Sequence, residues 1–135
     1  MSRISEMFRT HPQQSNLGLE KLSACVEACL ECVGSCSSCA DACLGEADPA
    51  MMRNCIHSCS DCADICATTA KVVARMTAVN LERLRKQVEA CVVCCRSCAE
   101  ECESHADHHE HCRICATVCR DCEQACNDLL SALAA

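Results

Sequence analysis

The chain has 135 residues, of which 20 are cysteine and one is aromatic, and its formal net charge is −7. Its length suits a single domain. An acidic chain with almost no aromatic side chains lacks the basic surface and the stacking faces that nucleic-acid binding needs, so no nucleic-acid partner is expected. Without the cysteines only about a third of the residues are ordinary apolar core residues, so thiols must fill much of the core.

Residues 1–16 contain no cysteine and form an N-terminal extension, in which we expect a short helix over residues 2–9, before Pro12. The extension has no long apolar run after its basic residues, no small-residue cleavage site and no twin arginine, so no secretory signal is expected. No stretch of eighteen uncharged apolar residues occurs, so we expect no membrane span and no membrane partner. A cytoplasmic protein with reduced thiols is therefore expected.

Residues 17–135 hold all the cysteines, in four groups with alternating steps of three and four residues. Such steps place side chains on one face of an α-helix, whereas a strand would need steps of two. Nineteen cysteines follow these rows, and Cys94 lies beside the third row. The candidate metal ligands are all twenty cysteines: Cys25, Cys29, Cys32, Cys36, Cys39, Cys43, Cys55, Cys59, Cys62, Cys66, Cys91, Cys94, Cys95, Cys98, Cys102, Cys112, Cys115, Cys119, Cys122 and Cys126.

The rows predict four helices, over residues 17–44, 49–78, 81–105 and 108–133. Gly45 ends the first helix, Asp48 with the proline after it begins the second, and Asn80 caps the third. Asp107, with Glu110 three residues later, resembles a capping box for the fourth helix. Short connections make successive helices antiparallel neighbours. The predicted fold class is therefore all-α, an antiparallel up-down-up-down four-helix bundle with a cysteine-lined core.

The spacing within each row favours a metal site over a disulfide framework. Cysteines one helical turn apart have Cβ atoms roughly 5–6 Å apart, whereas a disulfide needs about 3.8 Å. The same spacing suits a soft ion held between two thiolates, for which Cu(I) is favoured while zinc and iron–sulfur clusters compete. Zinc and iron–sulfur centres group four ligands around one centre, whereas these rows run along the whole bundle and favour a chain of ions bridged by sulfur.

Charge also favours a monovalent ion. Ionising all 20 thiols would take the net charge from −7 to −27, and about twenty Cu(I) ions would restore −7 and leave a neutral core. Two sulfurs per metal and two metals per sulfur give about one Cu(I) per cysteine, with up to about one proton released for each ion. Neutral thiols pack as small apolar groups, so the metal-free fold is expected to be stable.

Repeated C-x3-C motifs, namely CVEAC, CVGSC, CADAC, CIHSC, CADIC and CEQAC, resemble those of the bacterial copper storage proteins, and the lack of an export signal matches their cytosolic branch. The resemblance covers roughly residues 17–133. It implies a four-helix bundle that stores many Cu(I) ions inside, usually as a homotetramer, with metal entering at one end. We also consider a copper chaperone as the donor of these ions.

The two ends of the bundle differ beyond the cysteines. At the end near residue 25 the rows continue with aliphatic side chains, which predict a hydrophobic plug: Leu22, Val73, Leu84, Val88, Leu129 and Leu133. At the other end, His105 and His109 are the first candidates for metal ligands at a mouth, and His108, His111 and Met51 are a second rank of residues for metal entry. A solvated polar corner explains the histidines equally well, and methionine more often packs in a core or caps a helix.

No set of nucleophile, base and orienting residue and no Gly-rich phosphate loop is found, so the chain is not expected to be an enzyme. The leading function is cytosolic copper storage and detoxification. The alternative is a cysteine-rich bundle that binds zinc or iron–sulfur clusters. The colour of the metal-loaded protein distinguishes iron–sulfur clusters from copper, because iron–sulfur proteins are brown whereas thiolate-bound Cu(I) is colourless.

Overall fold

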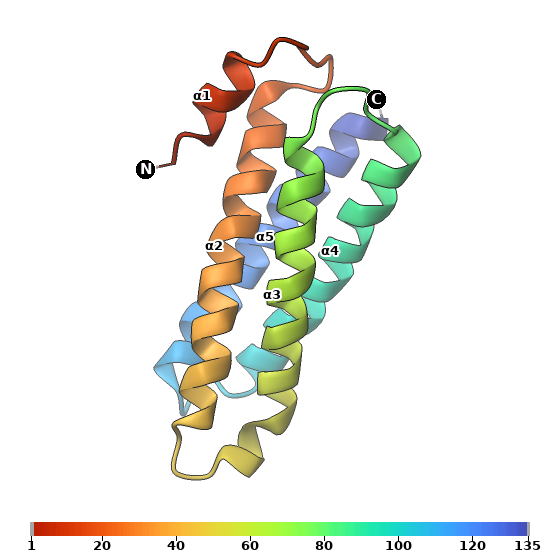
Figure 1. Ribbon diagram of the computed structural model, residues 1–135. Helices are drawn as coiled ribbons and strands as arrows, with labels where there is room; N and C mark the ends of the chain where they lie inside the picture. Colours follow the sequence, from red (N-terminus) through yellow and green to blue (C-terminus); the bar gives the residue numbers. More distant parts are fainter. Residues whose placement is uncertain (1, 135) are drawn as a thin grey trace.

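The computed structural model describes residues 2–134, and over that range all the regular secondary structure is helical. They are α1 (Ile4–Arg9), α2 (Leu19–Leu44), the short 3-10 helix η1 (Pro49–Met52), α3 (Arg53–Ala74), α4 (Leu81–Glu103) and α5 (Glu110–Ala134). The four long helices run alternately up and down (Figure 1). Helix α2 packs against α3 and α5, and α4 packs against the same two helices. The predicted four-helix bundle is confirmed. Among the described residues, none of the helices combines the length and apolarity needed to span a membrane.

Helices α2 and α4 begin and end close to the predicted positions. Gly18 precedes α2 with φ +86°, a conformation that glycine adopts without strain. Gly45 follows α2, and its N–H donates to the carbonyls of Asp41 and Ala42 at 3.2 and 3.0 Å. Asn80 caps α4 as predicted, because its Oδ1 accepts a hydrogen bond from the backbone N–H of Arg83 at 2.9 Å.

The second predicted helix differs from the structure at both ends. Residues 49–52 form the 3-10 helix η1, and regular α-helix begins only at Arg53. At the other end α3 stops at Ala74, followed by extended backbone at Arg75. The predicted boundaries at residues 49 and 78 are therefore wrong as limits of one α-helix. A 3-10 helix has three residues per turn, so η1 changes which side chains face the bundle.

The predicted capping box before α5 is also wrong. Residues 104–108 form a turn, in which the N–H groups of His108 and His109 donate to the carbonyl of His105 at 3.1 and 3.0 Å. Helix α5 therefore begins at Glu110, three residues after Asp107, and the Glu110 carboxylate pairs with Arg113 instead of reaching back.

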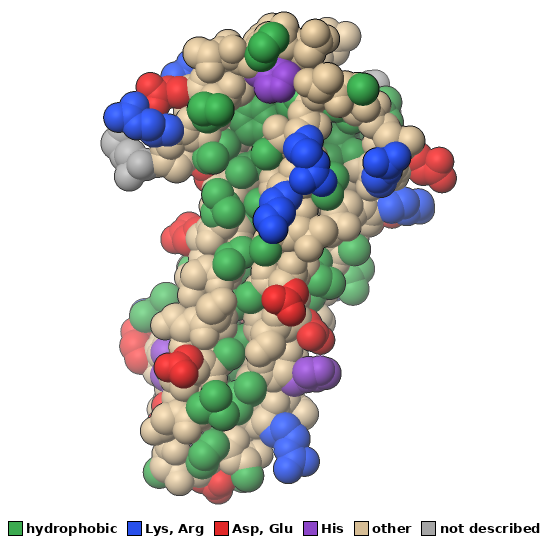
Figure 2. Space-filling view, viewed as in Figure 1, with side chains coloured by type: hydrophobic (Ala, Val, Ile, Leu, Met, Phe, Trp, Pro, Cys, Tyr) green, Lys and Arg blue, Asp and Glu red, His purple; other side chains and the backbone are tan. Residues whose placement is uncertain are grey.

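The predicted aliphatic plug closes one end of the bundle, at the top of Figure 1. Its side chains have at most 8% exposure: Leu22, Val73, Leu84, Val88, Leu129 and Leu133. Helix α1 packs against α2, and its Phe8 is buried in the same core. On the face shown in Figure 2, most of the Lys and Arg side chains also lie toward this end. This end is therefore sealed by apolar side chains and, on that face, carries positive charge.

Candidate metal centre

Between the plug and the opposite end, the core is built of sulfur. Nineteen of the twenty cysteine side chains are 0–1% exposed, and all twenty are free thiols. The prediction that the rows point inward is confirmed. We call these nineteen side chains the sulfur column; they are all the cysteines except Cys94.

Neighbouring sulfurs touch along the whole column. The Sγ of Cys36 lies 3.6 Å from that of Cys32 on the same helix and 3.6 Å from that of Cys119 on α5. Close to the plug, the Sγ atoms of Cys25 and Cys126 are 3.7 Å apart. At the far end, the Sγ atoms of Cys55 and Cys102 are 3.8 Å apart. No aliphatic layer interrupts the column between these limits, so an ion bound at one sulfur has another sulfur within reach.

The candidate ligand groups overlap. Each group places its four ligand atoms within 4.8 Å of one another: Cys29, Cys66, Cys91 and Cys122; Cys32, Cys66, Cys95 and Cys122; Cys32, Cys36, Cys62 and Cys119; Cys39, Cys59, Cys102 and Cys115; and Cys39, Cys43, His111 and Cys112. The first two groups share two sulfurs. Cys32 belongs to both the second and the third group, and Cys39 belongs to both the fourth and the fifth. The column is thus a continuous set of soft ligands in which several four-ligand groups share sulfurs.

Burial and neighbouring thiols act in opposite directions on the acidity of the column. Burial raises the pKa of Cys43 to about 11, because a thiolate loses its hydration there. Burial likewise raises the pKa of Cys112. Deeper in the column, a hydrogen bond from Cys126 lowers the pKa of Cys122 to about 7. The thiols at the open end therefore keep their protons at neutral pH, while the interior can supply a thiolate for a cation.

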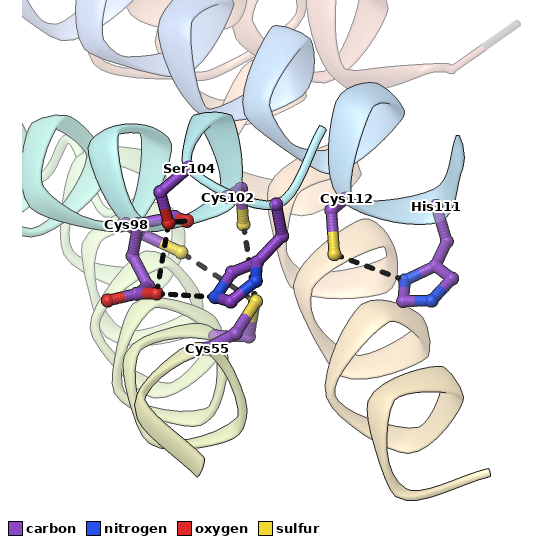
Figure 3. Close-up of polar contacts among 9 residues, drawn as sticks. Cys55, Cys98, Cys102, Ser104, His111 and Cys112 are labelled. Atoms are coloured by element: carbon purple, nitrogen blue, oxygen red, sulfur yellow. Dashed lines mark hydrogen bonds and ion pairs between the residues drawn. The ribbon is translucent and has the colours of Figure 1, made fainter. Parts of the chain in front are cut away.

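Five residues at the open end were candidates for the mouth, and His111 lies closest to the column. Its Nδ1 is 3.6 Å from the Sγ of Cys112 (Figure 3) and 3.5 Å from the Sγ of Cys39. Its Nε2 lies 2.7 Å from Oε2 of Glu46, which also lies 3.1 Å from Nδ1 of His109. The hydrogen bond from His111 lowers the pKa of Glu46, so this carboxylate is ionised at neutral pH. The mouth therefore combines thiols, imidazoles and the ionised carboxylate of Glu46.

A family profile described as copper storage protein matches residues 19–131. The chain belongs to the copper storage protein family. The match covers all four long helices except the last residues of α5. A search of curated protein sequences found no match.

Solved structures of another family member share this fold. The copper storage protein Ccsp from Streptomyces lividans, loaded with 10 copper equivalents, is 43% identical, with a TM-score of 0.93 over 95% of this chain and 98% of that chain. A structure described as that organism's cytosolic copper storage protein with five coppers is 46% identical, with a TM-score of 0.82 over 83% and 93% of the two chains. A Ccsp variant with one histidine replaced by alanine is 44% identical, with a TM-score of 0.86 over 88% and 99%.

For this copper storage protein, the ranking of the other mouth residues changes. His105 and His109 are both half-buried, and the Nε2 of His105 lies 2.8 Å from Oε2 of Glu101. His108, a second-rank candidate for metal entry, is exposed. The inward direction predicted for Met51 is wrong, because its side chain is 71% exposed and the neighbouring Met52 is 2% exposed. The 3-10 geometry of η1 is the reason, since it turns residue 52 toward the core.

The position of His111 next to the column could have been predicted from the sequence by counting from a different cysteine. Counting back from Cys112 leads to His108 and His105, which places His111 off the row. Counting back four residues from Cys115 leads directly to His111. Because α5 begins at Glu110, only the second count stays within the helix.

Cys94 is the one cysteine outside the column. It is half-buried on α4, and its thiol neighbours Cys62. Contact with Cys62, together with burial, raises the pKa of Cys94. The prediction that Cys94 stands beside the third row is confirmed, and its thiol is the most accessible of the twenty.

Proposed function

We propose that this chain is a cytosolic store that holds many Cu(I) ions on the thiolates of the sulfur column, at roughly one ion per cysteine. The observation that carries the proposal is the overlap of the four-ligand groups, in which the same sulfurs belong to two groups at once. A shared thiolate bridges two metals, so ions bound to such groups form a chain. The proposed ligands are the nineteen cysteines of the column together with Cys94.

The charge balance of a buried site supports Cu(I) over zinc. Twenty thiolates carry 20 negative charges. Five Zn²⁺ ions, each with four thiolates, would leave the core at −10, and a buried charge of that size is very costly. About twenty Cu(I) ions leave no net charge, and soft thiolates favour Cu(I). Iron–sulfur clusters need separate groups of four thiolates, whereas here Cys32, Cys66 and Cys122 each belong to two groups.

We propose that the ions enter and leave at the end that holds His105, His109 and His111. At this end imidazole nitrogens lie next to the column, and imidazole is an acceptable ligand for an incoming Cu(I). The opposite end is closed by aliphatic side chains, through which a cation would have to pass without ligands. His108 and Met51 are exposed and take at most a first contact with the ion.

Three parts of the proposal concern the molecule around the store. Residues 17–135 are proposed to form the storage bundle, and residues 1–16 an accessory extension. The family resemblance supports a homotetramer, which light scattering of the metal-free and loaded protein would test. A copper chaperone is the proposed donor, and Cu(I) transfer from a purified chaperone would test that. The proposed role is sequestration, which protects the cytosol from copper and involves no catalysis.

An anaerobic titration of the reduced, metal-free protein with Cu(I), in the presence of a competing chelator, tests the proposed function. Saturation near the number of cysteines, with a colourless product and up to about one proton released per ion, is the expected result. Saturation near four or five ions would contradict storage on bridging thiolates. A parallel titration with Zn²⁺ is the control, and it should saturate at a much lower number of ions.

A further inference from the structure

One carboxylate holds the histidine that touches the sulfur column. Glu46 lies in the loop after α2, directly beyond Gly45, and its side chain is 29% exposed. Its Oε2 lies 2.7 Å from Nε2 of His111 and 3.1 Å from Nδ1 of His109. The two histidine rings have centroids 5.6 Å apart. The carboxylate of Glu46, at the end of α2, therefore contacts the imidazoles of both His109 and His111, at the start of α5.

This contact decides which nitrogen of His111 carries the proton. A neutral imidazole has one N–H and one lone pair, and a carboxylate accepts a hydrogen bond but donates none. The Nε2 of His111 must therefore carry the hydrogen that is donated to Glu46. The lone pair is then on Nδ1, which faces the Sγ of Cys112 at 3.6 Å (Figure 3) and the Sγ of Cys39 at 3.5 Å.

The resulting donor set is complete before any metal binds. The Nδ1 of His111 and the sulfurs of Cys39, Cys43 and Cys112 lie within 4.8 Å of one another. Cys39 also belongs to the next group of the column, so an ion held here has a sulfur in common with the interior. The other tautomer would present an N–H to the same sulfurs, and a ring flipped by half a turn would present a C–H, so neither could bind a cation there.

We propose that Glu46 is a positioning residue for copper entry, which fixes His111 with its proton on Nε2 and its Nδ1 lone pair directed at Cys39, Cys43 and Cys112. This rests on the proposed function, since it names the device that makes the first site of the column ready for Cu(I). Glu46 does not touch the ion and acts through His111. Carboxylates that orient metal-binding histidines in this way commonly change metal affinity by about 10–100-fold when they are removed.

The tautomer can be measured without copper. Two-bond ¹⁵N–¹H correlation spectra of the reduced, metal-free protein give the protonation of each ring nitrogen, and His111→Ala assigns the signals. We expect a single tautomer for His111, with hydrogen on Nε2 and none on Nδ1. In Glu46→Ala the ring loses this restraint, and both nitrogen shifts should move toward values for exchanging tautomers. Hydrogen on Nδ1 in the native protein, or unchanged shifts in Glu46→Ala, would overturn the proposal.

The matched control is Glu101→Ala. Glu101 is a carboxylate of similar exposure, 24%, that contacts His105 at 2.8 Å in the same way. Its removal should leave the nitrogen shifts of His111 unchanged. If Glu101→Ala moves those shifts as much as Glu46→Ala does, the effect is a general loosening of the mouth and the positioning role is refuted.

Kinetics then test the role in copper entry. Uptake from a Cu(I)–chelator complex should be slowed about tenfold by Glu46→Ala and to the same degree by His111→Ala, with no further loss in the double variant. The final number of ions should be unchanged in Glu46→Ala, because Glu46 does not touch the ion. Normal uptake by Glu46→Ala, or additive losses in the double variant, would refute the role of Glu46. A native protein that binds only a few ions would instead refute the storage function, and the tautomer spectra would still report on Glu46.

Discussion

Raising the pH should destabilise the metal-free protein and leave the copper-loaded protein almost unaffected. Burial raises the pKa of Cys43 to about 11 and also raises the pKa of Cys112. In the unfolded chain both thiols ionise near the ordinary value of 9.0. Above that pH the unfolded state therefore binds fewer protons than the folded state, so the free energy of unfolding falls as the pH rises toward about 11. Below about pH 9 the contribution of these thiols is fully present.

The size of the effect follows from the number of thiols that stay protonated. Each one lowers the free energy of unfolding by about 1.4 kcal/mol per pH unit. Each thiol ionises gradually around its pKa in both states, so we take half of the joint maximum for Cys43 and Cys112, about 1.4 kcal/mol per pH unit. In a domain of this length such a loss lowers Tm by roughly 5 °C per pH unit. Copper-bound thiolates have already lost their protons, so the loaded protein should not show this decrease.

Thermal unfolding followed by circular dichroism, under anaerobic reducing conditions from about pH 8 to about pH 10.5, measures this decrease. The matched control is the double variant Cys43→Ala/Cys112→Ala, which keeps the helices and removes both thiols. Lysine and other groups that titrate in this range affect both proteins equally. Native and double-variant proteins with the same dependence of Tm on pH would refute the reasoning, because the two buried thiols would then contribute nothing.

Three further changes give simple outcomes. A maleimide added to the folded, metal-free protein should label Cys94 first, since it is the one thiol outside the column, and peptide mapping that finds Cys43 labelled earlier would contradict this. Asn80→Ala should lower the stability by about 1 kcal/mol, because the side-chain cap of α4 is lost. The control Asn80→Asp should keep the cap, and both variants should have the native copper capacity. Deleting residues 1–16 should lower Tm and leave the copper capacity unchanged. Phe8→Ala should reproduce most of the lost stability, up to about 3 kcal/mol. A lower copper capacity after the deletion would show that the extension belongs to the store.

The helices and the column could be predicted because the cysteine spacing repeats so often. Steps of three and four residues recur in every group, and no other regular structure places all of them on one side. The ends of α3 could not be predicted in the same way. No glycine or proline stands between Ala74 and Asn80, and the chain leaves the helix there through extended backbone at Arg75 and a positive φ at Ala78. Met76 is 6% exposed, so packing against the core rather than a local signal ends α3.

The mouth was harder to predict than the column because it lies where helices end. The sequence indicates a cluster of histidines after Cys102 but not which of them face inward. That depends on the turn at residues 104–108, which places the start of α5 at Glu110 and brings His111 onto the row of Cys115. Glu46 is more than sixty residues away in the chain and carries no motif, so only the packed structure brings it to His111.

Stability and storage are placed in different parts of the same bundle. A fully buried Leu or Val contributes about 1.5–3 kcal/mol, and the six side chains of the plug give such burial whether or not metal is present. The thiols of the column also pack as small apolar groups when protonated, so the empty fold needs no ion to hold it together. A cation that crossed the aliphatic end would lose all its ligands, which supports the proposed path through the end where imidazoles and thiols meet. Leu129→Ala should therefore lower Tm without changing capacity, whereas Cys36→Ala should lower capacity with a much smaller effect on Tm. Equal losses of capacity from both variants would show that the plug and the column are not separate.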